Sequence, residues 1–262
     1  MTARDDAEGL SPVPKSVVAR ALLILGQFSA TTPSMTISQL SRATGLPVAT
    51  VFRLLGELEA GHFVQRAGNG QFRLGNRLWE MGLLTPLHGR LRETALPFLL
   101  NLQYKTRETV QFAIPNGDAA LYIEKLTHEE AVPHQSRIGS PMPWHGTGVG
   151  KVMLAFGDEA TRDEVLGQPL AAHTPDTLVD PTVLRRELLA IRQRGYSTSA
   201  GEYVAGSTSI AAPVIVHGVV HAAVGIVNYR MDAGLERFSE PLLHAAQGIS
   251  RRLEDTDGLI GQ

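Results

Sequence analysis

Apolar residues recur at three- and four-residue spacing in three successive segments near the N-terminus, which predicts three short amphipathic helices. The first segment runs from Ser16 to Ser29. The second begins at Thr36, which we expect to cap it, and ends at Gly45. The third begins at Pro47, where the missing N–H costs nothing, and ends at Gly61. The residues of its predicted buried stripe are Val51, Leu54, Leu55 and Leu58.

Two short segments with alternating apolar residues follow, at 62–65 and 71–74, and a Gly/Asn-rich stretch joins them. This pattern predicts a β-hairpin. Three helices and a two-stranded wing would make a compact domain at residues 15–75, after a polar tail at 1–14 that we expect to be flexible. We expect residues 76–90 to form a linker helix.

From residue 91 the hydrophobic period changes repeatedly between helical and extended spacing. Strands are expected at 109–114, 119–126, 132–138, 209–216 and 219–228, and helices at 146–156, 158–166, 183–194 and 235–253. The two kinds of element alternate without a strict βαβ rhythm. Residues 91–256 are therefore predicted to form an α+β domain with a largely antiparallel sheet.

Composition narrows the class of protein. The 262 residues are 43% apolar and 19% charged, an ordinary globular mix. Cysteine is absent, which excludes a disulfide framework, a thiolate metal site and a cysteine nucleophile. No apolar run approaches the ~20 residues that span a bilayer, and the polar N-terminus lacks the apolar segment of a signal peptide. We therefore expect a cytoplasmic protein with no membrane partner.

Basic residues are concentrated in the N-terminal part of the chain. The formal net charge of the whole chain is −2, but the segment from Lys15 to Arg73 contains six basic and two acidic residues, a net +4. A local anionic partner is one explanation for this asymmetry, and an ordinary solvated face is the other.

The outward face of the third predicted helix is typical of a recognition helix. If the apolar stripe is buried, Val48, Ala49, Thr50 and Arg53 point outward at the end that meets base edges in the major groove. The Arg53 guanidinium is able to pair with guanine through two hydrogen bonds. The alternative is a helical hairpin that packs within the protein or against another protein.

Two further places suit contact with phosphates. Thr36 and Ser38, at the start of the second helix, offer hydroxyl and backbone N–H groups. Arg66 and Arg73 flank the hairpin tip that contains Asn69, and they suit a phosphate or a minor groove. Together with the recognition helix, these features predict a winged helix-turn-helix that binds double-stranded DNA.

Longer stretches of the chain resemble the IclR family of bacterial transcription regulators. The matching stretches are SVVARAL at 16–22, GLPVATVFRLL at 45–55, FRLG at 72–75, HGTGVGKVMLA at 145–155, RQRGY at 192–196 and SIAAPV at 209–214. The resemblance implies a homodimer or homotetramer that binds a pseudo-palindromic operator. It also implies that residues 91–256 form a GAF-like effector-binding and oligomerisation domain for a small metabolite, often a carboxylate or aromatic acid of a catabolic pathway.

The sequence departs from the family pattern at three places. The family often has Lys or Arg where Val48 stands, so this recognition helix is less basic. The position of Ser209 is commonly Cys in the family. The common acidic residue after the Gly-Tyr pair is replaced in the stretch STSAG at 197–201. The last two changes fall where family members line the effector pocket, and they put the usual effector identity in doubt.

A glycine-bearing stretch at 146–151, GTGVGK, is a candidate ligand-binding helix start. It lacks the spacing of a P-loop. Its exposed N–H groups are able to hold a carboxylate, and the alternative is close packing of a helix on a sheet. Small and hydroxyl-bearing residues on the expected strands would reach the same space, with Trp144 and Met142 as an apolar wall or as simple core. The candidate effector-binding residues are Trp144, Gly148, Val149, Ser199, Ser209, Gly225 and Val227.

No catalytic residue, metal site or cofactor is predicted. Ser207 and Ser209 lie in no Gly-x-Ser-x-Gly turn, and nothing marks a base for either. His217, His221 and His244 lack metal-ligand spacing. The sequence therefore predicts an IclR-type transcription regulator. The alternative is a non-catalytic small-molecule sensor whose helical hairpin makes protein contacts rather than DNA contacts.

Overall fold

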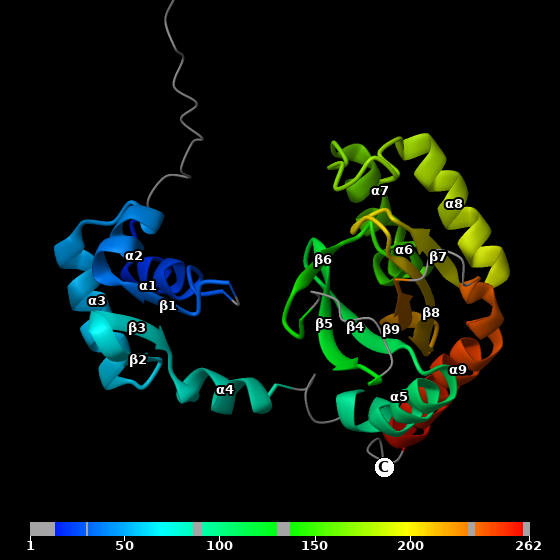
Figure 1. Cartoon of the computed structure of the whole chain (residues 1–262), viewed down its shortest axis with the longest axis horizontal. Coiled ribbons are helices and arrows are strands. Elements are labelled where there is room, and N and C mark those ends of the chain that lie inside the picture. The colour runs from blue at the N-terminus through cyan, green and yellow to red at the C-terminus, as the bar shows by residue number, and fades with distance from the viewer. Residues whose placement is uncertain (1–13, 30, 86–90, 130–136, 230–233, 259–262) are drawn as a thin grey trace, which may run out of the picture. The chain divides into compact units, whose positions relative to one another are not determined.

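The computed structural model describes residues 14–29, 31–85, 91–129, 137–229 and 234–258. The chain forms two compact units, residues 1–88 and 89–262 (Figure 1). Almost all of the expected tail at 1–14 lies outside the described residues, as does the end of the expected linker helix at 86–90. Each unit is described by itself below.

The N-terminal unit consists of helices packed on a three-stranded antiparallel sheet in the order β1-β3-β2. Its elements are α1 (Val17–Leu25), β1 (Ser34–Thr36), α2 (Ile37–Thr44), α3 (Val48–Ala60), β2 (Val64–Arg66), the 3-10 turn η1 (Gly68–Gly70), β3 (Gln71–Leu74) and α4 (Asn76–Leu83). The core takes side chains from α1, α2, α3 and the sheet, including Ile24, Leu40, Val51, Leu54, Leu55 and Phe72. The predicted winged helix-turn-helix is confirmed.

Two hydrogen-bond motifs set the angle between α2 and α3. A capping box begins α2: the Gln39 N–H donates to Thr36 Oγ1 at 3.3 Å, and the Thr36 N–H donates to Gln39 Oε1 at 2.8 Å. Gly45 ends α2 with a φ of 68°, which glycine adopts without strain. Leu46 is buried, and Ser41 Oγ donates to its carbonyl at 2.6 Å. Helix α3 therefore begins in a fixed direction.

Strand β1 is not predicted by the sequence pattern. It pairs with β3 so that Met35 lies opposite Phe72, and both side chains are buried. Three residues between a turn and a helix are too few to show the alternation that predicts a strand. Helix α1 also ends at Leu25, four residues before the expected end at Ser29.

The C-terminal unit is built on one six-stranded antiparallel sheet in the order β6-β5-β4-β9-β8-β7. The strands are β4 (Thr109–Asn116), β5 (Ala119–Leu126), β6 (Pro141–Pro143), β7 (Ser197–Ala200), β8 (Thr208–Val216) and β9 (Val219–Asn228). The four long strands match four of the expected ones, and the short edge strands β6 and β7 were not expected. Most of the expected strand at 132–138 lies outside the described residues. The predicted α+β class with a largely antiparallel sheet is confirmed.

Helices cover both faces of this sheet (Figure 1). The helices are α5 (Glu93–Thr106), α6 (Gly148–Phe156), α7 (Glu159–Gly167), α8 (Pro181–Arg194) and α9 (Ser239–Gly258), with the 3-10 turn η3 (Leu235–Phe238) before α9. Helices α5 and α9 share one hydrophobic cluster with the sheet, and α6 and α8 share the other. The sheet is therefore the middle of three layers.

Alternation along β8 and β9 decides which residues face α6. On β8, Ile210 belongs to the cluster with α5 and α9, whereas Ala211 belongs to the cluster with α6. On β9, Ile226 belongs to the α5 and α9 side. Because side chains alternate between the faces of a strand, the odd-numbered neighbours face α6. These neighbours are Ser209, Gly225 and Val227.

Candidate nucleic-acid interface and ligand cavity

The predicted recognition face of α3 is open to solvent. Val48, Ala49 and Arg53 are exposed and Thr50 is half-buried. Arg53 Nη1 donates to Glu57 Oε1 at 2.6 Å, one turn further along the helix, and both side chains are more than half exposed. An exposed ion pair of this kind is weak. The guanidinium is therefore available to another acceptor at little cost.

The start of α2 differs from the expectation at one residue. Ser38 is exposed in the first turn, as a phosphate-contacting residue would be. The Thr36 N–H and hydroxyl, in contrast, both bond to the Gln39 side chain within the capping box. Thr36 therefore caps α2, and a phosphate would have to displace Gln39 to reach these groups.

The wing presents its three predicted residues differently. Asn69 is exposed at the tip with a left-handed φ of 62°, and Arg73 is exposed on β3. The Arg66 guanidinium lies 4.9 Å from the centre of the Phe72 ring and donates to both carboxylate oxygens of Glu59, at 3.0 and 3.1 Å. Arg66 therefore ties the wing to α3, while Asn69 and Arg73 extend from it.

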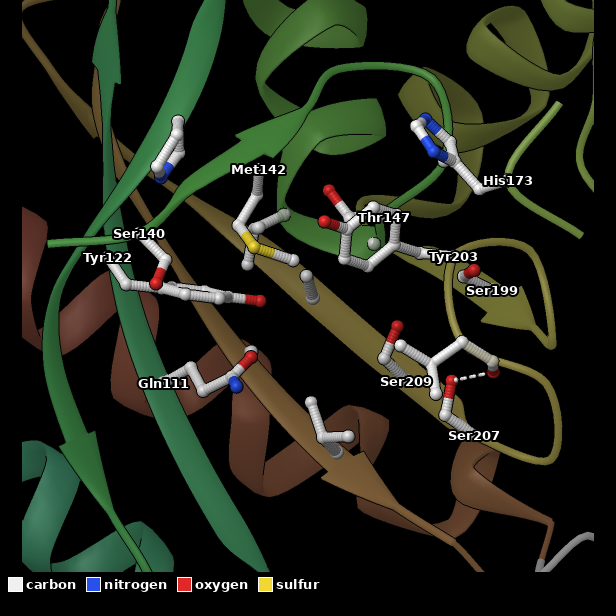
Figure 2. Close-up of a pocket in the computed structure, with 18 of the residues that line it drawn as sticks. Gln111, Tyr122, Ser140, Met142, Thr147, His173, Ser199, Tyr203, Ser207 and Ser209 are labelled. Atoms are coloured by element: carbon white, nitrogen blue, oxygen red, sulfur yellow. Dashed lines mark hydrogen bonds between the residues drawn. The ribbon is translucent and has the colours of Figure 1, made fainter. Parts of the chain in front are cut away.

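A cavity of about 460 Å³ lies between the start of α6 and the sheet in the C-terminal unit (Figure 2). It has a size typical of a small-molecule site. The structure brings six of the seven candidate effector-binding residues together on its lining. These six are Gly148, Val149, Ser199, Ser209, Gly225 and Val227.

Trp144 is the exception and corrects the expectation. Met142 lines the cavity, but Trp144 is only 5% exposed, belongs to the core with α6 and α8, and does not line this cavity. The chain turns after β6 to enter α6, and the backbone of Gly150 packs against it: a Cβ at 150 would lie 2.7 Å from the Pro143 carbonyl oxygen. This turn directs the indole into the core instead of the cavity.

The start of α6 packs closely against its neighbours and also lines the cavity. Thr147 caps the helix, because its Oγ1 accepts from the Gly150 N–H at 3.1 Å. Gly150 permits close packing, while Gly148 forms part of the cavity wall, where a Cβ would lie 2.8 Å from Ser209 Oγ. The first N–H groups of a helix have no partner within the helix and favour an anion. The cavity wall therefore includes a helix start suited to a carboxylate.

The rest of the lining is neutral and rich in hydroxyl groups. None of the described lining residues is Lys, Arg, Asp or Glu. Burial raises the pKa of Tyr122 far above its ordinary value, with further contributions from Tyr203 and Tyr229, so the phenol keeps its proton and is able to donate. Burial and the nearby His145 lower the pKa of His173, which keeps its imidazole neutral at pH 7. The negative charge of an anionic ligand would thus be stabilised by hydrogen bonds from backbone N–H and side-chain O–H groups.

Several lining residues were not predicted from the sequence. Figure 2 shows Tyr122 and Met142 on one side of the cavity and Tyr203 and Ser199 on the other. Tyr122 follows the alternation of β5, which could have indicated that it faces α6. Tyr203 and His173 lie in loops, where no hydrophobic period indicates a direction.

The loop at 201–207, which carries Tyr203, is held by a buried ion pair. Lys151 on α6 is 1% exposed, and its Nζ donates to Glu202 Oε1 at 2.6 Å. Thr177 Oγ1 also donates to the Glu202 carbonyl at 2.6 Å, and Thr174 Oγ1 donates to the Gly201 carbonyl at 2.7 Å. The ion pair joins the helix whose start lines the cavity to the loop that forms the opposite wall.

Within the described ranges, no group of three or more His, Asp or Glu side chains is arranged to hold a metal ion. No helix in the part of the chain that the structure describes is both long enough and apolar enough to cross a bilayer.

A winged helix-turn-helix in the same chain as an α+β unit with a ligand-sized cavity is the architecture of a transcription regulator. The model of the IclR helix-turn-helix domain matches residues 17–68, and that of the bacterial transcriptional regulator IclR C-terminal domain matches residues 87–251. The chain belongs to the IclR family of transcription regulators. The family resemblance predicted from the sequence is confirmed.

Individual relatives agree with this assignment. The chain is 33% identical over 248 residues to the HTH-type transcriptional regulator XynR of Escherichia coli, which covers 92% of this chain and 98% of XynR. It is 32% identical over 224 residues to the E. coli repressor AllR, and the match covers 84% of this chain and 82% of AllR. These relatives are regulators, which confirms that the chain is a regulator and not an enzyme.

Solved structures show the same fold. An IclR homolog from Microbacterium hydrocarbonoxydans, in complex with 4-hydroxybenzoate, has a TM-score of 0.86 and 34% identity, covering 92% of this chain and all of that chain. The IclR of Thermotoga maritima has a TM-score of 0.71 and 28% identity, and the match covers 91% of this chain and 97% of that chain.

The buried ion pair between α6 and the 201–207 loop leads to a stability prediction. Lys151→Met leaves the Glu202 carboxylate buried without its cation, and Glu202 Oε2 already has no hydrogen-bond partner among the described residues. Removing one partner of a buried pair costs about 3–5 kcal/mol. We expect this loss in the free energy of unfolding, measured by urea denaturation with the fluorescence of the buried Trp144 as the probe.

The control is the exposed ion pair between Arg185 and Asp163 in the same unit, which has an N–O distance of 3.0 Å. Arg185→Met should change the free energy of unfolding by less than about 1 kcal/mol. Equal effects of Lys151→Met and Arg185→Met would contradict the stabilising role of the buried pair.

Proposed function

We propose that the chain binds a pseudo-palindromic operator as a homodimer or homotetramer in the cytoplasm, and that a small carboxylic acid in the cavity changes this binding. One observation carries the proposal: the cavity in the C-terminal unit has a helix start and hydroxyl groups for an anion but no charged side chain among its described lining residues. A family regulator with such a cavity has the means to respond to an acid.

DNA contact is assigned to residues 15–75, with α3 in the major groove. The side chains that support this are exposed and polar or basic, above all Arg53, Ser38, Asn69 and Arg73. Arg53 exchanges its weak contact with Glu57 for a guanine edge, to which it donates two hydrogen bonds. Ser38 and the wing contact phosphates and fix the register of the helix.

Assembly is assigned to apolar side chains of the N-terminal unit in addition to the C-terminal domain. Val18 and Leu22 on α1, Trp79 on α4, and Leu84 directly after α4 are large, apolar and exposed. Exposed apolar groups of this kind mark interaction surfaces. A second copy would bury them and hold two recognition helices at the spacing of two half-sites.

The effector is assigned to aromatic or hydroxylated carboxylic acids. Its carboxylate would lie at the start of α6, near Gly148, and the phenol of Tyr122 would donate to an oxygen of the ligand. Gly225 and Val227 give the cavity an apolar floor on β9 that suits a ring. The 4-hydroxybenzoate bound to the Microbacterium homolog is a suitable first probe. A GAF-like sensor domain for residues 91–256 fits this assignment.

Arg53→Ala tests the DNA interface. We expect operator affinity to fall by about tenfold or more, because a bidentate pair with guanine discriminates by about 1–3 kcal/mol and a phosphate-steering cation is lost as well. Fluorescence anisotropy with DNA from upstream of the gene measures the change.

Arg185→Ala is the matched control, since Arg185 and Arg53 have equally exposed side chains and each pairs with an acidic residue. It should leave DNA affinity unchanged. If Arg53→Ala also leaves it unchanged, Arg53 does not contact the operator. A wild-type protein that binds no DNA at moderate salt would favour the alternative function, in which the helical hairpin serves protein contacts.

Ser209→Val tests the cavity. The substitution removes a hydroxyl and adds methyl groups at the wall that faces Gly148. We expect about tenfold weaker binding of any acid that the wild type binds, measured by calorimetry with a panel that begins with 4-hydroxybenzoate. Thr208→Val, one residue earlier on β8 and outside the described lining, should bind the acid like the wild type. Unchanged binding by Ser209→Val would place the effector elsewhere.

A further inference from the structure

Two exposed apolar residues on the recognition helix, Val48 and Phe52, have no role in the polar DNA contacts proposed above. Phe52 is 60% exposed and Val48 is 54% exposed. They are four residues apart on α3 and therefore lie on one side of the helix, one above the other. Arg53 follows Phe52 directly. Phe52 was not among the residues predicted from the sequence to contact DNA.

Packing fixes the direction of this pair. Val51, Leu54 and Leu55 are at most 1% exposed and hold the neighbouring side of α3 in the core. Rotation of the helix to bury Phe52 would carry Leu54 out of the core. The aromatic ring therefore stays outside in the free protein.

Small residues on the same outward face leave room for a close approach to DNA. Ala49 is exposed, and a Cβ added at Gly56 would meet nothing within 4 Å. The floor of a groove is therefore able to come near the helix backbone between Val48 and Phe52. A large apolar side chain on such a face must find an apolar group on the partner, because otherwise it desolvates polar base edges without compensation.

The apolar group that the major groove offers is the C5-methyl of thymine. We propose that Val48 and Phe52 contact thymine methyl groups in the operator half-site, next to the base pair that Arg53 contacts. This inference rests on the proposed operator binding and specifies its chemistry. At position 48 a methyl contact takes the place of the hydrogen bond or phosphate contact that a cation would make.

The experiment compares thymine with deoxyuridine, which differs only in lacking the methyl group. Full-length wild-type protein first selects its site from a random duplex library, and the selected duplex is then made with deoxyuridine at one thymine at a time. We expect Kd to rise about fourfold for each contacted methyl, the value for one buried methyl-sized group. The sensitive positions should cluster beside the guanine at which Arg53→Ala loses discrimination.

Phe52→Ala identifies the residue responsible. This variant should bind the thymine site more weakly than the wild type and should not distinguish thymine from deoxyuridine at the positions that Phe52 contacts. Its circular dichroism spectrum should match that of the wild type, since Phe52 is exposed. Leu189→Ala, a change at a similarly exposed apolar residue (56%) on α8, should keep both the wild-type Kd and the deoxyuridine effect.

Two results would overturn the inference while leaving operator binding intact. One is a selected site at which no deoxyuridine substitution changes Kd, or a site without thymine. The other is a Phe52→Ala variant that keeps the full deoxyuridine effect, which would assign Phe52 to a protein contact. If the wild type selects no sequence at moderate salt, the proposed operator binding is wrong, and the inference that rests on it is wrong as well.

Discussion

The close approach of α6 to strands β8 and β9 is the constraint on which the ligand cavity depends. Gly150 lies against the backbone of the β6–α6 turn, where a Cβ would contact the carbonyl oxygens of Pro143 and Trp144. Gly148 faces Ser209, and Gly225 faces Val149, with no room for a Cβ in the first case and little in the second. Because side chains are missing at these positions, the first turn of the helix can line the cavity with its backbone. The dipoles of a helix start then supply a positive potential that no lysine or arginine supplies among the lining residues that the structure describes.

In the N-terminal unit, buried packing likewise fixes the position of an exposed functional surface. The buried stripe of α3 and the capped, glycine-ended α2 fix the direction of the recognition helix before any DNA is present. A preformed face costs less to bind than one that must be ordered. The packing of α3 fixes where the side chains of Arg53 and Phe52 begin, while the ion pair of Arg66 with Glu59 connects the wing to this helix.

Elements in which apolar residues recur at regular spacing were predictable from the sequence, and elements without such spacing were not. The stripe of α3, the hairpins and the inward positions Ser209, Gly225 and Val227 follow from helical or alternating spacing. Trp144 was misplaced because it comes after the end of β6, where the chain turns and the alternation no longer applies. Lys151 and Glu202 are 51 positions apart, and no local pattern indicates that they pair. The same holds for the loop residues of the cavity and for the three-residue strand β1.

The central claim is that one chain couples an acid in the cavity to an operator. The most direct measurement is a DNase footprint of the full-length protein on DNA upstream of its own gene, with and without the acids that calorimetry shows to bind. We predict protection of two symmetry-related half-sites whose extent changes when a bound acid is present. Protection that no bound acid alters, or no protection at moderate salt, would contradict the account.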